Sequence, residues 1–104
     1  MTTKFKPYYA VIFTSTQKSS IKGYSEMAAK MEALAKQQDG FIGLDSARNE
    51  VGITVSYWRD LDSITAWKQN SDHLAAQQKG KTEWYSWYSV KICKVEREYQ
   101  FGEY

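Results

Sequence analysis

The sequence predicts an α+β fold in which two helices cover one face of a four-stranded antiparallel sheet. Hydrophobic residues recur with the period of a strand or of a helix along the chain, in the order β-α-β-β-α-β. That order is the split-βαβ, ferredoxin-like arrangement, whose helices lie on one side of the sheet. The whole chain, residues 1–104, is expected to form a single domain, because its length suits one hydrophobic core.

The first strand and the first helix follow each other in the N-terminal part of the chain. Residues 8–16 (YYAVIFTST) are rich in β-branched and aromatic residues, which favours a strand. A helix is expected over residues 21–38, with Ser19 or Ser20 capping its start and Gly40 ending it. The apolar stripe of this helix consists of Tyr24, Met27, Ala28, Met31, Leu34 and Ala35.

Two further strands form a predicted hairpin at residues 41–48 and 51–58. The polar pair Asn49-Glu50 separates the two β-like runs and makes the tight turn between them. Alternate residues of the second strand lie on opposite faces of the sheet. One face carries Ile53, Val55 and Tyr57, and the other carries Thr54, Ser56 and Trp58.

A second helix and a last strand complete the predicted fold. Asp60 caps the helix, which continues as one segment until Gly80 interrupts it. Its stripe is traced by Leu61, Ile64, Trp67, Ser71, Leu74 and Gln78. The last strand is expected at residues 88–99. One of its faces carries Tyr88, Val90 and Ile92, and the other carries Ser89, Lys91, Cys93 and Val95.

Charge and composition exclude several classes of function. The chain has 14 basic and 12 acidic residues and a net charge of +2, without a long run of like charges, so no nucleic-acid partner is expected. No segment is apolar for long enough to cross a membrane, and the N-terminus does not read as a signal peptide. We therefore expect a cytoplasmic protein. One cysteine and one histidine do not form a standard metal site, so no metal is assigned.

Aromatic residues make up 15% of the chain, which is a high share for a domain with limited core volume. Two helices can cover only one face of the predicted sheet, so the other face stays exposed in a monomer. An apolar sheet face of that extent favours association with a second copy. We therefore expect a homodimer in which two sheets pack face to face and form an α+β barrel.

The candidate site residues are single side chains, because no standard catalytic motif occurs in the sequence. Trp67 lies on the stripe of the second helix, where it either fills the core or forms the wall of a pocket for a flat aromatic molecule. Arg48 and Asn49, next to the hairpin turn, either stay in solvent or enter a cavity. Each alternative remains open at this point.

His73 is the one histidine of the chain and follows Trp67 by six residues. On a continuous α-helix this spacing places the two side chains roughly 120° apart. A lone histidine in this position is either an ordinary surface residue of the helix or a functional group. In the second case it acts as an acid or base, or it binds haem iron around the flank of the helix.

A resemblance to a known family rests on five stretches of sequence. They are PYYAVIFTS, DGFIGLDSARNEVGITVSYW, SYWRDLDSITAW, SDH and WYSWYSVKICKVEREY. Through these stretches, which cover nearly the whole chain, the sequence resembles the antibiotic biosynthesis monooxygenase (ABM) family, and most of all its small bacterial members. The resemblance implies a dimeric α+β barrel with a cavity between the sheet and the helices of each subunit. It also implies one of two activities: oxidation of polycyclic aromatic substrates with O₂ and without metal or flavin, or degradation of haem.

Single positions carry the family's functional residues over to this chain. The helix tryptophan that packs on the bound planar ligand matches Trp67. Gln77 stands where the haem-degrading members have a histidine that binds iron, and residues 8–16 lack the asparagine that those members have in the first strand. In the branch that oxidises polyketides, a tyrosine, a tryptophan, an arginine and an asparagine assist the reaction. The candidates for these roles are Tyr57, Trp67, Arg48 and Asn49.

The expected function is that of an ABM-family monooxygenase acting with O₂ on a planar aromatic substrate, which is quinol- or polyketide-like or is haem. The candidate catalytic residues are His73, Trp67 and Tyr57. The candidate ligand-binding residues are Trp67, Arg48, Asn49 and Gln77. No cofactor is assigned, and haem stays open as a substrate or a ligand. The alternative is a non-catalytic dimer that binds haem or another small, planar hydrophobic molecule.

Overall fold

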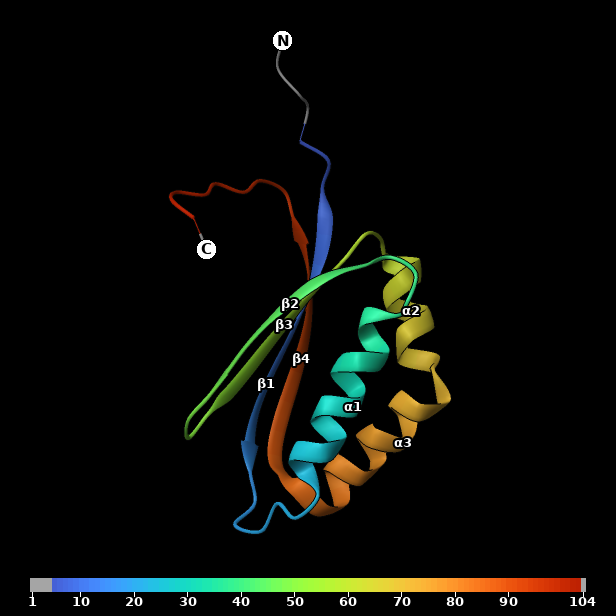
Figure 1. The fold of residues 1–104 in the computed structure, drawn as a ribbon, viewed down its shortest axis with the longest axis vertical. Coiled ribbons are helices and arrows are strands. Elements are labelled where there is room, and N and C mark those ends of the chain that lie inside the picture. Colours follow the sequence, from blue (N-terminus) through green and yellow to red (C-terminus); the bar gives the residue numbers. More distant parts are fainter. Residues whose placement is uncertain (1–4, 104) are drawn as a thin grey trace.

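The computed structural model describes residues 5–103 and consists of one four-stranded antiparallel sheet with a layer of helices on one face (Figure 1). Along the chain the elements are β1 (Tyr8–Gln17), α1 (Tyr24–Lys36), β2 (Phe41–Arg48), β3 (Gly52–Trp58), α2 (Leu61–Gln69), α3 (Ser71–Lys79), the π-helical turn η1 (Gly80–Trp84) and β4 (Tyr85–Val95). The strands lie in the order β2-β3-β1-β4, so the first and last strands are neighbours. The predicted ferredoxin-like α+β class is confirmed.

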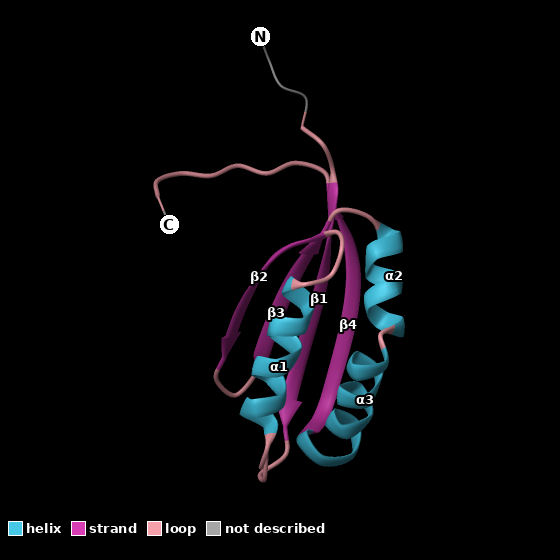
Figure 2. Cartoon of the chain, turned by 45° about the vertical axis from the view of Figure 1, so that its right-hand side comes forward, coloured by secondary structure: helices cyan, strands magenta, loops and turns pink. Residues whose placement is uncertain are grey.

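The helices all lie on the same face of the sheet, and within residues 5–103 no helix covers the opposite face (Figure 2). Side chains alternate along β1, where Val11 and Phe13 face the helices and Ile12 faces the other way. Ile12 pairs with Val55 of β3, which therefore also lies on the uncovered face. We call this surface the outer face. Within the described range, no helix is long and apolar enough to span a membrane.

The first helix is shorter than predicted at both ends. α1 begins at Tyr24 rather than near residue 21, and the residue before it is Gly23, with φ of 85°, instead of a capping serine. The helix ends at Lys36, before Gly40, which lies in the turn that leads into β2. Gly40 has the expected left-handed backbone, with φ of 85°. A Cβ atom there would overlap the hydroxyl oxygen of Ser63, so the turn also packs too closely against α2 for any side chain.

The predicted second helix is wrong as a single segment, because it breaks at Asn70. Asn70 has ψ of 128°, which is extended rather than helical, and it separates α2 from α3. Its side-chain oxygen accepts hydrogen bonds from the backbone N–H groups of Asp72 at 3.0 Å and His73 at 3.2 Å. These are the contacts of an N-cap, so Asn70 ends one helix and starts the next. Asp60 caps α2 as predicted, since its carboxylate accepts from the backbone N–H of Ser63 at 2.8 Å.

The last strand spans Tyr85–Val95 rather than the predicted residues 88–99. It starts directly after η1, where Tyr85 comes opposite Gln17 of β1. It ends at Val95, because its partner there is Tyr8, the first residue of β1. Residues 96–99 have no neighbouring strand and run away from the sheet (Figure 1).

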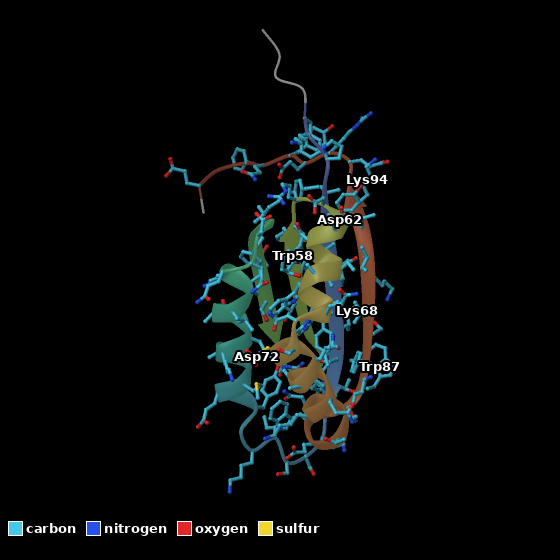
Figure 3. The ribbon with its side chains drawn as sticks, turned by 90° about the vertical axis from the view of Figure 1, so that its right-hand side faces the viewer. Trp58, Asp62, Lys68, Asp72, Trp87 and Lys94 are labelled. Carbon is cyan, nitrogen blue, oxygen red and sulfur yellow. The ribbon has the colours of Figure 1, made fainter. Side chains whose placement is uncertain are left out.

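Two tryptophans anchor the space between sheet and helices. Trp58, at the end of β3, is fully buried, and its indole N–H donates to the hydroxyl of Ser56 at 2.9 Å. In Figure 3, Trp58 is seen in the gap between α1 and α2. Trp84, in η1, is 3% exposed, and its indole N–H donates to the carbonyl of Lys22 at 2.9 Å. Both polar tips are thus paired, which lets the rings line the interior without an unsatisfied donor.

Candidate functional site

A cavity of about 510 Å³ lies between the helix layer and the sheet. Its floor is formed by helix-facing strand residues and its roof by residues of α1, α2 and α3. Most of the lining is apolar or aromatic. The floor includes Val11, Phe13, Leu44, Thr54, Ser56, Trp58, Tyr88, Val90 and Ile92, and the roof includes Tyr24, Met27, Ala28, Met31, Ile64, Trp67, His73, Ala76 and Gln77. The cavity is partly open to solvent beside β4, where Val90 is 48% and Ile92 53% exposed. Its size and composition are typical of a site for a small hydrophobic molecule.

A stack of rings forms one wall of the cavity. The ring of His73 lies over that of Trp67, with centroids 4.2 Å apart and planes inclined by 12°. Trp67 is also nearly parallel to Trp58, at 6.1 Å and 27°. Phe41 packs edge-on against Trp58 at 5.4 Å. The stack joins β2, β3, α2 and α3, so it holds the indole of Trp67 in one orientation.

The stack corrects the expectation that Trp67 and His73 point in different directions. That expectation assumed a continuous helix, and the break at Asn70 changes the direction of the chain between the two residues. Asn70 caps α3 by accepting from the backbone of His73 itself, so it sets the position of the imidazole. The cap thereby brings the two rings into contact.

His73 is held in one tautomer by its contacts. Its Nδ1 atom lies 3.0 Å from the carbonyl oxygen of Trp67, which can only accept, so Nδ1 carries the proton. Burial lowers the pKa of His73 below its ordinary value of 6.5, and the bond to the Trp67 carbonyl opposes this only in part. The imidazole is therefore neutral near pH 7, with an unprotonated Nε2 atom. Within residues 5–103 this nitrogen has no hydrogen-bond partner.

A second group of rings closes the opposite end of the cavity. Tyr24 of α1 packs edge-on against Trp84 at 5.7 Å and against Tyr85 at 5.9 Å. Phe13 of β1 lies 5.3 Å from Tyr85 and 5.2 Å from Tyr88. Burial, together with the neighbouring Tyr24 hydroxyl, raises the pKa of Tyr85. Tyr85 therefore stays protonated and can donate a hydrogen bond at any ordinary pH.

Arg48 lies at this second end, where β2 enters the hairpin. Its guanidinium donates to the hydroxyl of Ser15 and reaches the carbonyl of the same residue at 3.5 Å. The guanidinium carbon lies 5.9 Å from the centre of the Tyr24 ring. A cation, two tyrosines and a buried serine therefore gather at the end of the cavity that is remote from Trp58.

The structure brings four of the six predicted site residues to one cavity. They are Trp67, His73, Arg48 and Gln77. Tyr57 lies on the outer face, where its hydroxyl donates to Asp45 at 3.1 Å, and burial, then Asp45, raises its pKa. Asn49 is exposed in the hairpin turn. Neither Tyr57 nor Asn49 is among the residues that line the cavity.

Sequence reasoning missed Tyr24, Tyr85 and Ser15 as site residues. The sequence assigns Tyr24 to the apolar stripe of α1, and that stripe does face the cavity. Alternation would place Tyr85 on the same face as Trp87, two residues later, which is half exposed at the edge formed by β4 (Figure 3). The register shift opposite the end of β1 instead lets Tyr85 line the cavity, and no signal in the sequence predicts that shift. Ser15 has no signal of its own in the sequence, because its role comes from its contact with Arg48, 33 residues away.

Two known proteins are similar to this chain in sequence. It is 46% identical over 99 residues to the uncharacterized protein YqjZ of Bacillus subtilis, a match that covers 93% of this chain and 87% of that protein. It is 29% identical over 92 residues to the jasmonate monooxygenase ABM of Pyricularia oryzae. That second match covers 84% of this chain but only 43% of the fungal protein.

Solved structures share the fold of this chain, and a family model identifies its family. A protein of Shewanella oneidensis shares the fold with a TM-score of 0.76 at 8% identity, over 88% of this chain and 93% of that chain. A crystal structure of an antibiotic biosynthesis monooxygenase shares it with a TM-score of 0.72 at 10% identity, over 82% and 95%. At these identities the likeness shows the fold alone. The model of the antibiotic biosynthesis monooxygenase family matches residues 7–79, and this protein therefore belongs to that family.

Proposed function

We propose that this protein is a monooxygenase that uses O₂ to oxidise a planar aromatic substrate bound in the cavity. The observation that carries the proposal is the pairing of Trp67 with His73. The pair combines a flat aromatic wall with a neutral imidazole whose Nε2 atom can accept a proton. Membership of the family supports a monooxygenase reaction, and the ring-lined cavity supports a flat substrate.

The proposed reaction starts with proton transfer. His73 accepts a proton from an acidic C–H group of the substrate and leaves an enolate-like carbanion. The carbanion gives one electron to O₂, and the two resulting radicals combine into a C–O bond, which forms a peroxide. Loss of water from the peroxide then gives a ketone. Of the two oxygen atoms, one stays in the product and the other leaves in water with the two hydrogens of the original CH₂ group, so atoms and electrons balance.

The surroundings of the proposed base suit this chemistry. Apolar walls raise the free energy of an isolated charge, so a cation and hydrogen-bond donors near the developing anion matter more than in bulk water. Arg48 and the protonated hydroxyl of Tyr85 supply such groups at the far end of the cavity.

Oxygen uptake with a defined carbon acid tests the proposal. We expect O₂ consumption when anthrone is added, and formation of anthraquinone in equal amount. His73→Ala should lower kcat about a hundredfold or more, because it removes the base. Trp87→Leu is the matched control, since Trp87 is half exposed and outside the cavity.

Assays with haem distinguish three hypotheses: haem degradation, oxidation of another aromatic substrate, and binding without catalysis. With haem and a reductant, loss of the Soret band together with O₂ uptake would indicate haem as the substrate. A Soret shift without turnover, abolished in His73→Ala, would favour a binding protein over an enzyme. Absence of turnover with both anthrone and haem would contradict the proposed monooxygenase reaction.

We also propose that the protein forms a homodimer through the outer face. This face carries apolar side chains such as Ile12 and Val55, and Ile53 on it is 45% exposed. Within residues 5–103 no helix covers these side chains. Packing two such sheets together would remove the apolar surface from water and close a barrel.

A further inference from the structure

We propose that Arg48 binds an anionic oxygen of the ligand, so that the substrate is a flat aromatic molecule with a carboxylate or an enolate at one end. This inference rests on the proposed function, because it names the class of molecule that the same cavity takes. It assigns the two ends of the cavity different tasks: the Trp67–His73 pair contacts the rings of the ligand, and Arg48 binds its charge.

A glycine in the neighbouring strand makes room for the guanidinium group of Arg48. Arg48 of β2 pairs with Gly52 of β3, which is buried. A Cβ atom on Gly52 would overlap the guanidinium carbon of Arg48. The absence of a side chain at position 52 therefore leaves the space in which the guanidinium lies. Arg48 reaches across it to Ser15 of β1, which is fully buried.

Within the described residues, some N–H donors of Arg48 have no acceptor and its charge has no carboxylate partner. Its guanidinium has five N–H donors, and the contacts in residues 5–103 are those to the hydroxyl and carbonyl of Ser15. No described carboxylate lies within ion-pair distance of it, whereas Arg59 pairs with both Asp39 and Asp60. Arg48 is exposed, so water solvates its charge until a ligand carboxylate or enolate replaces that water.

The charges around the cavity favour the same class of ligand. Lys68 and Lys81 line the cavity together with Arg48, and Glu32 is the one carboxylate among the described lining residues. Glu32 is already paired with Lys36, at 3.5 Å. The cavity therefore presents an excess of positive charge, which attracts anions and repels cations.

A matched pair of probes tests the inference by isothermal titration calorimetry. Naphthoate and its neutral methyl ester share one ring system and differ in charge. The wild-type protein should bind naphthoate about tenfold or more tightly than the ester. Arg48→Gln should remove this preference and leave binding of the ester unchanged. Lys30→Gln is the control, because Lys30 is exposed on α1 and is not among the residues that line the cavity, so this variant should keep the preference.

A second variant tests the position of the charge rather than its presence. Gly52→Ala keeps Arg48 but places a methyl group where the guanidinium lies, so it should also reduce the preference for naphthoate. Thermal unfolding followed by circular dichroism checks that both variants fold. Naphthol, titrated through the ionisation of its hydroxyl, distinguishes an enolate-like anion from a carboxylate.

The outcomes separate this inference from the proposed function. An Arg48-dependent preference for either anion, naphthoate or ionised naphthol, supports the inference. Equal binding of anionic and neutral probes by the wild type, or a preference that survives in Arg48→Gln, overturns it while the cavity remains a binding site. If no probe binds at all, the proposed function fails and the inference fails with it.

Discussion

The imidazole of His73 stacks on the indole of Trp67, at 4.2 Å and 12°, and accordingly the two residues act as one unit. A second contact reinforces the pair, since Nδ1 of His73 donates to the backbone carbonyl of Trp67 at 3.0 Å. The unit exists because Asn70 breaks the helix between the two residues. A flat wall and a proton acceptor thus come from adjacent short helices at the roof of one cavity.

The pKa of His73 is directly measurable, because this is the one histidine of the chain. Its ring protons should titrate by NMR below the ordinary value of 6.5, since burial favours the neutral imidazole. Unfolded chains then bind a proton that the folded protein does not. The free energy of unfolding should therefore fall as the pH drops from 6.5 towards the lowered pKa. His73→Gln should lose this part of the pH dependence, and an apparent pKa at or above the ordinary value would refute the assignment.

Replacing Asn70 with alanine should both destabilise the protein and loosen the ring stack. The substitution removes the acceptor for the N–H groups of Asp72 and His73, and loss of such a cap costs about 1 kcal/mol. Urea unfolding gives the change in free energy, and the NMR shifts of the His73 ring report the stack. Asn70→Asp is the control, because an aspartate caps a helix equally well. Unchanged His73 shifts in Asn70→Ala would show that the cap does not position the imidazole.

Gly40→Ala should destabilise the protein much more than Gly43→Ala. Gly40 has left-handed backbone, which costs other residues about 1–2 kcal/mol, and its Cβ atom would also collide with Ser63. Gly43 lies in β2, and a methyl group on it would meet nothing within 4 Å, so alanine should be neutral there. Thermal unfolding of both variants decides the matter. Equal melting temperatures would mean that the close contact between this turn and α2 is not essential.

A single charged substitution tests whether the outer face is a dimer interface. Val55→Glu should shift a dimer towards monomer in sedimentation experiments, because it buries a carboxylate between two apolar sheets. Val51→Glu, at an exposed position in the hairpin turn, should leave the oligomeric state unchanged. A wild-type protein that sediments as a monomer at all concentrations would exclude the proposed pairing.

Local patterns in the sequence predicted most of the helices and strands, but not the break between α2 and α3 or the face of β3 that meets the helices. Alternation in residues 51–58 correctly separated Tyr57 from Trp58, yet both faces carry apolar residues, so the pattern could not tell which one meets the helices. The apolar spacing from Leu61 to Leu74 continues across Asn70, and periodicity therefore hid the break. Asn70 followed by Asp72 is itself an N-cap signal that could have predicted it.

Local patterns also predicted part of the candidate site, but not the contacts between residues far apart in the sequence. Trp67 lies on a helical stripe, which indicates an inward direction from the sequence alone. Arg48 instead acquires its neighbours through the sheet, because β1 lies beside β3 and brings Ser15 within reach. Contacts of this kind depend on strand order and register, and no local pattern encodes them.

The indole N–H signals of the four tryptophans give the most direct test of the cavity as a binding site. Trp58, Trp67 and Trp84 line the cavity, and Trp87 does not. When naphthol is titrated into the labelled protein and followed by ¹H–¹⁵N correlation spectra, the signals of the first three should move with one common dissociation constant while that of Trp87 stays in place. Movement of the Trp87 signal alone, or of none of the four at saturating naphthol, would contradict the account.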